Sequence, residues 1–148
     1  QDNRLDMLSA RAVRHQTGLL GVWLERKAQE HGKSKRSVTP AQKLVIRFLE
    51  LVEQRLGQGD NVAAFAEHLG VTPTHLTRCC RKTIGRAALD LLNERLHHRA
   101  RVLLQDSPAP VKEVASKVGF ASAAYFTRAF QNHSGLTPSE FRNQPQAA

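Results

Sequence analysis

The chain has 148 residues, of which 41% are hydrophobic, and a formal net charge of +9 at pH 7. This length allows one compact domain with an appendage, or two very small domains, and the apolar content is enough for a core. The pI near 10.4 favours nucleic acid or an anionic surface as the partner. No apolar run approaches the roughly 20 residues of a membrane span, and no signal peptide is visible.

Residues 1–30 alternate apolar and charged side chains at a spacing that suggests an amphipathic helix or a short coiled-coil seam. Gly18 and Gly21 weaken this prediction, because each costs about 1 kcal/mol relative to Ala inside a helix. Two interpretations stay open: a helix that pairs with a second chain as a homodimer, or the edge of a missing domain. Trp23 is a buried anchor in both. The chain begins at Gln1 rather than Met, so a fragment of a longer protein is expected.

Residues 31–38 form a basic linker. It is either a solvated tether or a segment whose Lys33, Lys35 and Arg36 touch phosphates without sequence preference.

A strong helix is predicted to begin after Thr39, because Thr39, Pro40 and Gln42 form a capping box. Gly57 marks its end. One face of this helix is apolar and consists of Leu44, Val45, Phe48, Leu49, Val52 and Leu56.

A helix-turn-helix is predicted over about residues 61–85. Asp60 or Asn61 caps its first helix, Gly70 makes the turn, and Thr72 caps the second helix. Its apolar positions are expected to be Val62, Ala63, Ala66, Leu69, Leu76, Cys80 and Ile84.

A long helix is predicted over residues 86–106, and the proline-rich segment that follows stops it. Its apolar positions are expected to be Leu89, Leu92, Leu96, Ala100 and Leu103. At about 1.5 Å per residue it spans roughly 30 Å. One turn of B-DNA is about 34 Å, so this helix is long enough to hold two units on successive major-groove faces.

A second helix-turn-helix is predicted over about residues 110–135, with Gly119 at the turn and Ser122 as a cap. A short C-terminal helix follows over residues 137–144. The two helix-turn-helix segments repeat each other, with one residue inserted in the second turn. Ala66, Gly70, Leu76, Thr77, Arg78, Cys80 and Gly85 match Ala115, Gly119, Phe126, Thr127, Arg128, Phe130 and Gly135. Two outward arginines at the same turn of two similar helices suggest equivalent contacts to a repeating partner such as DNA.

Cysteine and histidine residues do not suggest a metal or cofactor site. Cys79 and Cys80 are adjacent and lack the paired spacing of a zinc site, and Cys80 is expected to be a small buried hydrophobe in a reducing, cytoplasmic compartment. His97 and His98 diverge by about 100° on a helix and do not chelate together well.

The segments LGVTPTHLTR, LNERLHHRARVLL, VKEVASKVGFASAAYFTRAF and GLTPSEFR resemble the DNA-binding domain of the arabinose-regulator (AraC/XylS) family of bacterial transcription regulators. The resemblance covers about residues 39–142. It implies an all-α, homeodomain-like fold of seven helices, in which a long helix joins two helix-turn-helix subdomains. It also implies promoter DNA and RNA polymerase as partners, activation of transcription, and a small-molecule effector held only by a missing N-terminal domain. Residues 1–30 then resemble the end of that domain.

The resemblance assigns the DNA contacts residue by residue. Base-reading positions fall on Thr74, Thr77 and Arg78 in the first recognition helix, and on Ala123, Ala124, Thr127 and Arg128 in the second. Phosphate contacts are expected from Thr72, Arg81, Lys82, Ser122 and Thr137. The two alanines depart from the long polar side chains of some members, which puts base reading by the second unit in doubt. Surface ion pairs, or phosphate contacts without sequence information, are the alternative roles for the two arginines.

Two other function classes compete with DNA binding. Some alkyl-damage response proteins fuse this domain to a zinc-bound, methyl-accepting cysteine, but that site needs four cysteines and this chain has two. No Ser-His-Asp or paired-carboxylate arrangement is readable either, so no enzyme activity is expected. The remaining alternative is a helical interaction module that binds another regulator and no longer reads DNA.

Overall fold

The computed structural model describes residues 37–145. All of the helices described lie within residues 39–148, which form one compact unit. The predictions for residues 1–36, a helical extension and a basic linker, lie outside the described residues.

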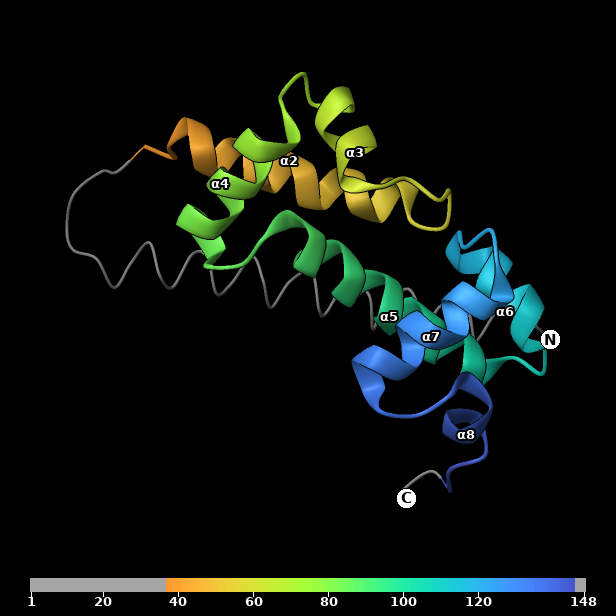
Figure 1. The fold of residues 1–148 in the computed structure, drawn as a ribbon. Coiled ribbons are helices and arrows are strands. Elements are labelled where there is room, and N and C mark those ends of the chain that lie inside the picture. Colours follow the sequence, from red (N-terminus) through yellow and green to blue (C-terminus); the bar gives the residue numbers. More distant parts are fainter. Residues whose placement is uncertain (1–36, 146–148) are drawn as a thin grey trace, which may run out of the picture. The chain divides into compact units, whose positions relative to one another are not determined.

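Residues 37–145 contain seven α-helices and no strand, which confirms the predicted all-α fold. Helix α5 runs between a first subdomain made of α2, α3 and α4 and a second subdomain made of α6, α7 and α8 (Figure 1). The helices are α2 (Pro40–Arg55), α3 (Val62–His68), α4 (Pro73–Ile84), α5 (Ala88–Asp106), α6 (Val111–Val118), α7 (Ala123–Ser134) and α8 (Pro138–Arg142).

Side-chain caps fix where most of these helices begin. The Thr39 hydroxyl accepts from the Gln42 amide at 3.2 Å, and the Gln42 side chain accepts from the Thr39 amide at 2.8 Å. The same reciprocal pair joins Thr137 and Glu140 before α8. Each pair satisfies amide donors that a helix start leaves without intrahelical partners.

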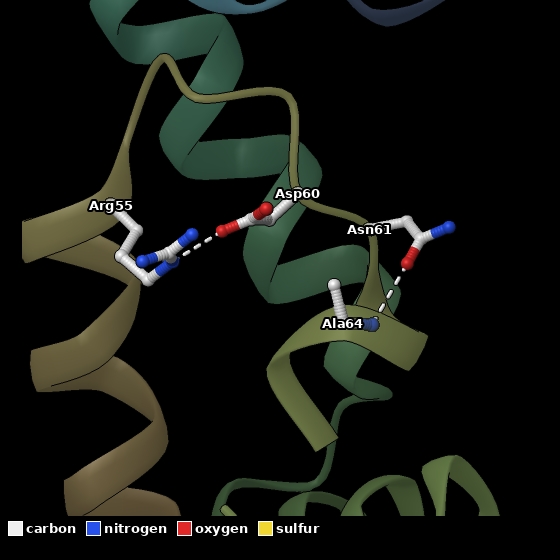
Figure 2. A network of polar contacts seen from close by, with 4 residues as sticks. All are labelled: Arg55, Asp60, Asn61 and Ala64. Carbon is white, nitrogen blue, oxygen red and sulfur yellow. Dashed lines mark hydrogen bonds and ion pairs between the residues drawn. The ribbon is translucent and has the colours of Figure 1, made fainter. Parts of the chain in front are cut away.

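The sequence left two candidates for the cap of α3, and the structure selects Asn61. Its side-chain oxygen accepts from the Ala64 amide at 2.9 Å, whereas Asp60 forms an ion pair with Arg55 at the end of α2 (Figure 2). The loop between α2 and α3 is therefore tied at both ends.

Two separate cores lie at the two ends of α5, and Leu96 packs against both. In the first, the rings of Phe48 and Phe65 meet edge to face with centroids 5.8 Å apart. In the second, Phe126 and Phe130 pack together, and Phe141 of α8 packs back on Phe130. Each subdomain therefore has its own hydrophobic centre.

Two expected core positions were wrong. Leu89 is 54% exposed, and the buried leucines of α5 are Leu91, Leu92 and Leu104. Ala63 is exposed, and the residue of α3 that enters the first core instead is Phe65, which is 1% exposed.

Both cysteines are buried. Burial, and then the neighbouring Cys79, raise the pKa of the Cys80 thiol to about 11. The thiol is therefore neutral near pH 7, which fits the expected role of a small hydrophobe. Among residues 37–145, no helix is both long enough and apolar enough to cross a bilayer.

Candidate nucleic-acid interface

The second helix of each repeat, α4 or α7, is held by its buried face. In α4, Leu76, Cys79 and Cys80 are buried, and in α7, Phe126 and Phe130 are buried. Both helices begin at a capping hydroxyl and end at a glycine, as the repeat predicts. Within residues 37–145, most side chains on their opposite faces are exposed.

The outer face of α4 gathers four of the residues predicted to contact DNA. Thr74, Thr77, Arg78 and Arg81, together with Pro73, line a shallow depression of about 470 Å³. These side chains recur at three- and four-residue steps, so they share one side of the helix. Thr77 is half-buried at the edge, and the other three predicted residues are exposed. The structure thus brings base-reading and phosphate candidates onto one surface.

The outer face of α7 has a different composition. Ala124, Tyr125 and Arg128 are exposed, while Thr127 is half-buried. Ala123 is half-buried and packs against the second core. Contact between Ala123 and a base therefore stays a prediction, and its methyl group has little free surface to offer.

Tyr125 was not singled out by sequence reasoning. It is 59% exposed and lies one helical turn before Arg128 on the same face, with its ring centroid 5.7 Å from that of Phe120. The sequence carried a signal for Tyr125, because it lies three residues before the outward Arg128 and residues three apart share one face of a helix. Tyr125 supplies a large ring and a hydroxyl beside Ala124.

The two faces also differ in charge. Arg78, Arg81 and Lys82 are exposed on α4, whereas the positions of α7 that correspond to Arg81 and Lys82 are the neutral Gln131 and Asn132. The first recognition helix therefore carries most of the positive charge.

None of these cations is neutralised within the part of the chain that the structure describes. The ion pairs there are Arg55–Asp60, Arg86–Glu94, Arg95–Glu53 and Lys117–Glu113, and they include neither Arg78 nor Arg128. A surface ion pair, one of the alternative roles for these two arginines, has no support there. Their guanidinium groups stay available to an anionic or base-edge acceptor.

The capping hydroxyls predicted to touch phosphate are already engaged by the backbone. Thr72 accepts from the His75 amide at 3.1 Å, Ser122 from the Tyr125 amide at 3.3 Å, and Thr137 from the Glu140 amide at 3.2 Å. Each hydroxyl uses a lone pair for its cap and keeps its own hydrogen, which can still be donated to a phosphate oxygen. Capping and phosphate contact are therefore compatible.

A larger hollow of about 570 Å³ lies between α5 and α7. His97 and His133 meet there with ring centroids 4.1 Å apart, and Arg128 lines the same hollow. Burial lowers the pKa of His97 to about 4, helped by positive charge at His133, Arg101 and His98. His97 is thus neutral at pH 7 and acts as a packing residue. No group of three or more potential metal ligands occurs in residues 37–145.

Comparisons with known proteins agree with this arrangement. Residues 65–144 match a family model described as a helix-turn-helix domain. The HTH-type transcriptional regulator GlxA of Rhizobium meliloti (strain 1021) is 38% identical over 101 residues, which are 68% of this chain and 31% of that protein. The arabinose operon regulatory protein of Escherichia coli (strain K12) is 32% identical over 82 residues, 55% of this chain and 28% of its own length.

A solved structure shares the fold. The DNA-binding domain of AdpA, solved in complex with a target DNA, superposes with a TM-score of 0.62 at 24% identity, covering 70% of this chain and 97% of that domain. The fold and the paired recognition helices define a helix-turn-helix protein. Because the family model matches more than half of the chain, the chain belongs to the helix-turn-helix family of the AraC type. It spans about three tenths of the length of the two regulators named above.

Proposed function

We propose that this chain is the part of a transcription regulator that binds double-stranded DNA in a sequence-specific manner, with α4 and α7 entering successive major-groove segments. The observation that carries the proposal is the pair Arg78 and Arg128. They occupy the same position of two similar helices, both are exposed, and neither is held by an ion pair in residues 37–145. The complex of the AdpA domain with its DNA adds support through the shared fold.

In this proposal α4 reads bases through Arg78, Thr74 and Thr77. An arginine can donate two hydrogen bonds to guanine O6 and N7, which is worth about 1–3 kcal/mol of discrimination. A threonine can meet a base edge or the methyl group of thymine. The common face of these residues supports their entering one groove together.

In α7 the proposed contacts are Arg128 and Thr127, with Ala123 and Ala124 limited to close approach or methyl contacts. Tyr125 extends this surface, since its exposed ring and hydroxyl lie next to Arg128. The second helix then depends on one guanidinium and one aromatic side chain rather than on several polar side chains.

The phosphate contacts hold both helices in register. Arg81 and Lys82 would meet the backbone beside α4, and the hydroxyls of Thr72, Ser122 and Thr137 would donate to phosphates at three helix starts, where the helix dipole also favours an anion. This electrostatic component makes binding sensitive to salt. Because α4 carries three cations and α7 one, we infer that the first subdomain anchors the complex.

The rest of the protein is inferred from the family. We propose that residues 39–148 form the DNA-binding domain and that residues 1–38 are the end of an effector-binding and dimerisation domain with its basic linker. A homodimer through residues 1–30, contact with RNA polymerase, activation of promoters and a cytoplasmic, nucleoid-associated location belong to this proposal. No enzyme activity, metal or cofactor forms part of it.

An interaction module that has lost DNA reading is the alternative function. Selection of binding sites from a random duplex library, at two salt concentrations, separates the two. Two motifs about one helical turn apart are expected, in keeping with the reach of α5. Binding that enriches no motif and that is lost at the higher salt concentration would favour the interaction module. Arg78→Ala with Arg128→Ala should abolish the enrichment, and unchanged binding by this double variant would count against the proposal.

A further inference from the structure

The two subdomains touch at a second place besides α5. The loop between α2 and α3 lies against the carboxyl end of α6, and the contact is made by backbone atoms of Gly57, Gly59 and Gly119. A Cβ at Gly119 would lie 2.6 Å from the Gly59 nitrogen and 3.0 Å from the Gly57 carbonyl. Separations below 3.0 Å are not tolerated, so no residue with a side chain fits there without moving a backbone.

The contact is equally close from the opposite side. A Cβ at Gly57 would lie 2.6 Å from the Lys117 carbonyl oxygen, and one at Gly59 would lie 2.9 Å from the Gly119 carbonyl oxygen. In glycine a hydrogen takes the place of Cβ and faces these oxygens, an arrangement that permits weak Cα–H···O contacts. Two segments far apart in the sequence thus meet with no side chain between them.

The loop that makes this contact is itself held in place. Arg55 and Asp60 form an ion pair across it, and Asn61 caps α3 directly after it (Figure 2). Inside the loop the Gln58 amide donates to the Arg55 carbonyl at 3.1 Å. On the other side, the Phe120 amide donates to the Ala115 carbonyl at 2.9 Å and closes the end of α6. Both surfaces of the contact are therefore ordered by their own hydrogen bonds.

We propose that residues 57–59 and the α6 end at Gly119 form a brace that fixes the separation and angle of the two recognition helices. The protein would then accept two DNA motifs at one spacing only. This inference rests on the proposed function, and Gly57, Gly59 and Gly119 act in it as positioning residues that do not touch DNA.

The reason is mechanical. Each subdomain has its own core, and Leu96 of α5 is shared between them. A connection through α5 alone leaves the subdomains free to bend or twist about that helix. A second contact point removes this freedom, so α4 and α7 present themselves to DNA as one rigid pair. Linked modules gain affinity only at spacings that their geometry allows them to engage together.

The repeat supplies a matched control for the test. Gly119 and Gly70 occupy the same turn of the two helix-turn-helix segments, with φ of 94° and 70°. An alanine at either position meets left-handed backbone strain, which is greater at Gly119. Only Gly119→Ala also brings a Cβ into the other subdomain, because nothing lies within 4 Å of a Cβ at Gly70. A difference between the two variants therefore reports the brace and not the turn.

The experiment measures affinity of the full chain for the selected two-motif duplex and for duplexes with one base pair inserted or deleted between the motifs. Wild type and Gly70→Ala are expected to lose about tenfold or more in affinity on a one-base-pair change, and Gly119→Ala less than about threefold. The same spacing dependence in Gly119→Ala as in Gly70→Ala would overturn the brace. If Gly119→Ala does not fold, as judged by circular dichroism, Gly59→Ala takes its place. A Cβ at Gly59 would lie 2.9 Å from its nearest neighbour, compared with 2.6 Å at Gly119.

A measurement without DNA separates failure of the brace from failure of the proposed function. Backbone ¹⁵N relaxation should report one common rotational diffusion for both subdomains in wild type and in Gly70→Ala, and two in Gly119→Ala. Independent tumbling of the subdomains in wild type would contradict the brace even if DNA binding is specific. Common tumbling in wild type that is lost in Gly119→Ala would support the brace even if wild type shows no specific binding, in which case only the proposed function fails.

Discussion

Arg142 of α8 donates from Nη2 to the carbonyl oxygen of Ala109 at 2.6 Å, and from Nε to the carbonyl oxygen of Leu104 at 3.1 Å. The bond to Leu104 supplies a hydrogen-bond donor that the helix itself lacks. In a regular helix the Leu104 carbonyl would accept from the amide of residue 108, but that residue is Pro108 and has no N–H. One guanidinium thus closes the end of α5 and fixes the segment that leads into α6.

Arg142→Ala should destabilise the second subdomain by about 2–3 kcal/mol, because it removes two charge-assisted hydrogen bonds and leaves half-buried carbonyls unpaired. The measurement is urea unfolding followed by circular dichroism. Arg99→Ala, at an exposed position of α5, is the control and should stay within about 0.5 kcal/mol of wild type. An equally small change for Arg142→Ala would show that the two bonds do not support the fold.

Arg78→Ala and Arg128→Ala should weaken binding to the selected duplex by about 1–3 kcal/mol each and relax the base preference of one motif each. The measurement is competition binding against duplexes carrying every base at each motif position. Arg99→Ala again serves as the control for loss of one positive charge away from the recognition helices. If Arg78→Ala or Arg128→Ala weakens binding to all duplex sequences equally, the arginine that was replaced contacts phosphate and not a base.

Arg81→Ala and Lys82→Ala should behave differently from the base-reading variants. Each should weaken binding to all sequences and lower the slope of log K against log salt by about 1. Gln131→Ala, the counterpart of Arg81 in α7, carries no charge and should leave the slope unchanged. A change in base preference with an unchanged slope would mean that Arg81 or Lys82 reads bases.

His97 should make folding stability depend on pH in the mildly acidic range. Its pKa falls from 6.5 to about 4 on folding, first through burial and then through positive charge at His133, Arg101 and His98. Between these values the unfolded chain binds a proton that the folded chain does not, so the free energy of unfolding decreases as pH falls. The contribution of neutral His97 to folding stability is fully present above pH 6.5 and is lost as the pH falls towards 4.

The test compares the free energy of unfolding at about pH 7 and about pH 5.5, above the range where carboxylates titrate. The decrease should be smaller in His97→Gln than in wild type, while His68→Gln, at an exposed position, should behave like wild type. An equal decrease in wild type and His97→Gln would assign the acid sensitivity to other groups.

Local signals in the sequence were sufficient for the helices and their caps. Thr39, Thr72 and Ser122 cap the helices that they were predicted to cap, since a capping hydroxyl acts on an amide three residues away. The outward positions of Arg78 and Arg128 follow from the same short-range periodicity.

The face of α5 and the contacts between subdomains could not be predicted in this way. This helix has leucines at six positions, so several registers look equally apolar, and the packing of α3, α4 and α6 selects Leu91, Leu92 and Leu104 over Leu89. The approach of Gly59 to Gly119 depends on how two separate cores are placed about α5. The residues next to Gly59 and Gly119 in the sequence therefore do not predict that these two glycines lie close together.

The most direct test of two-helix DNA reading is methylation interference at guanine N7, which lies in the major groove, on the selected duplex. Two clusters of interfering guanines, about one helical turn apart on one face of the duplex, are predicted. Arg78→Ala should remove the interference of one cluster and Arg128→Ala that of the other. A single cluster that Arg128→Ala leaves unchanged, or no interference at all, would contradict insertion of both α4 and α7 into the major groove.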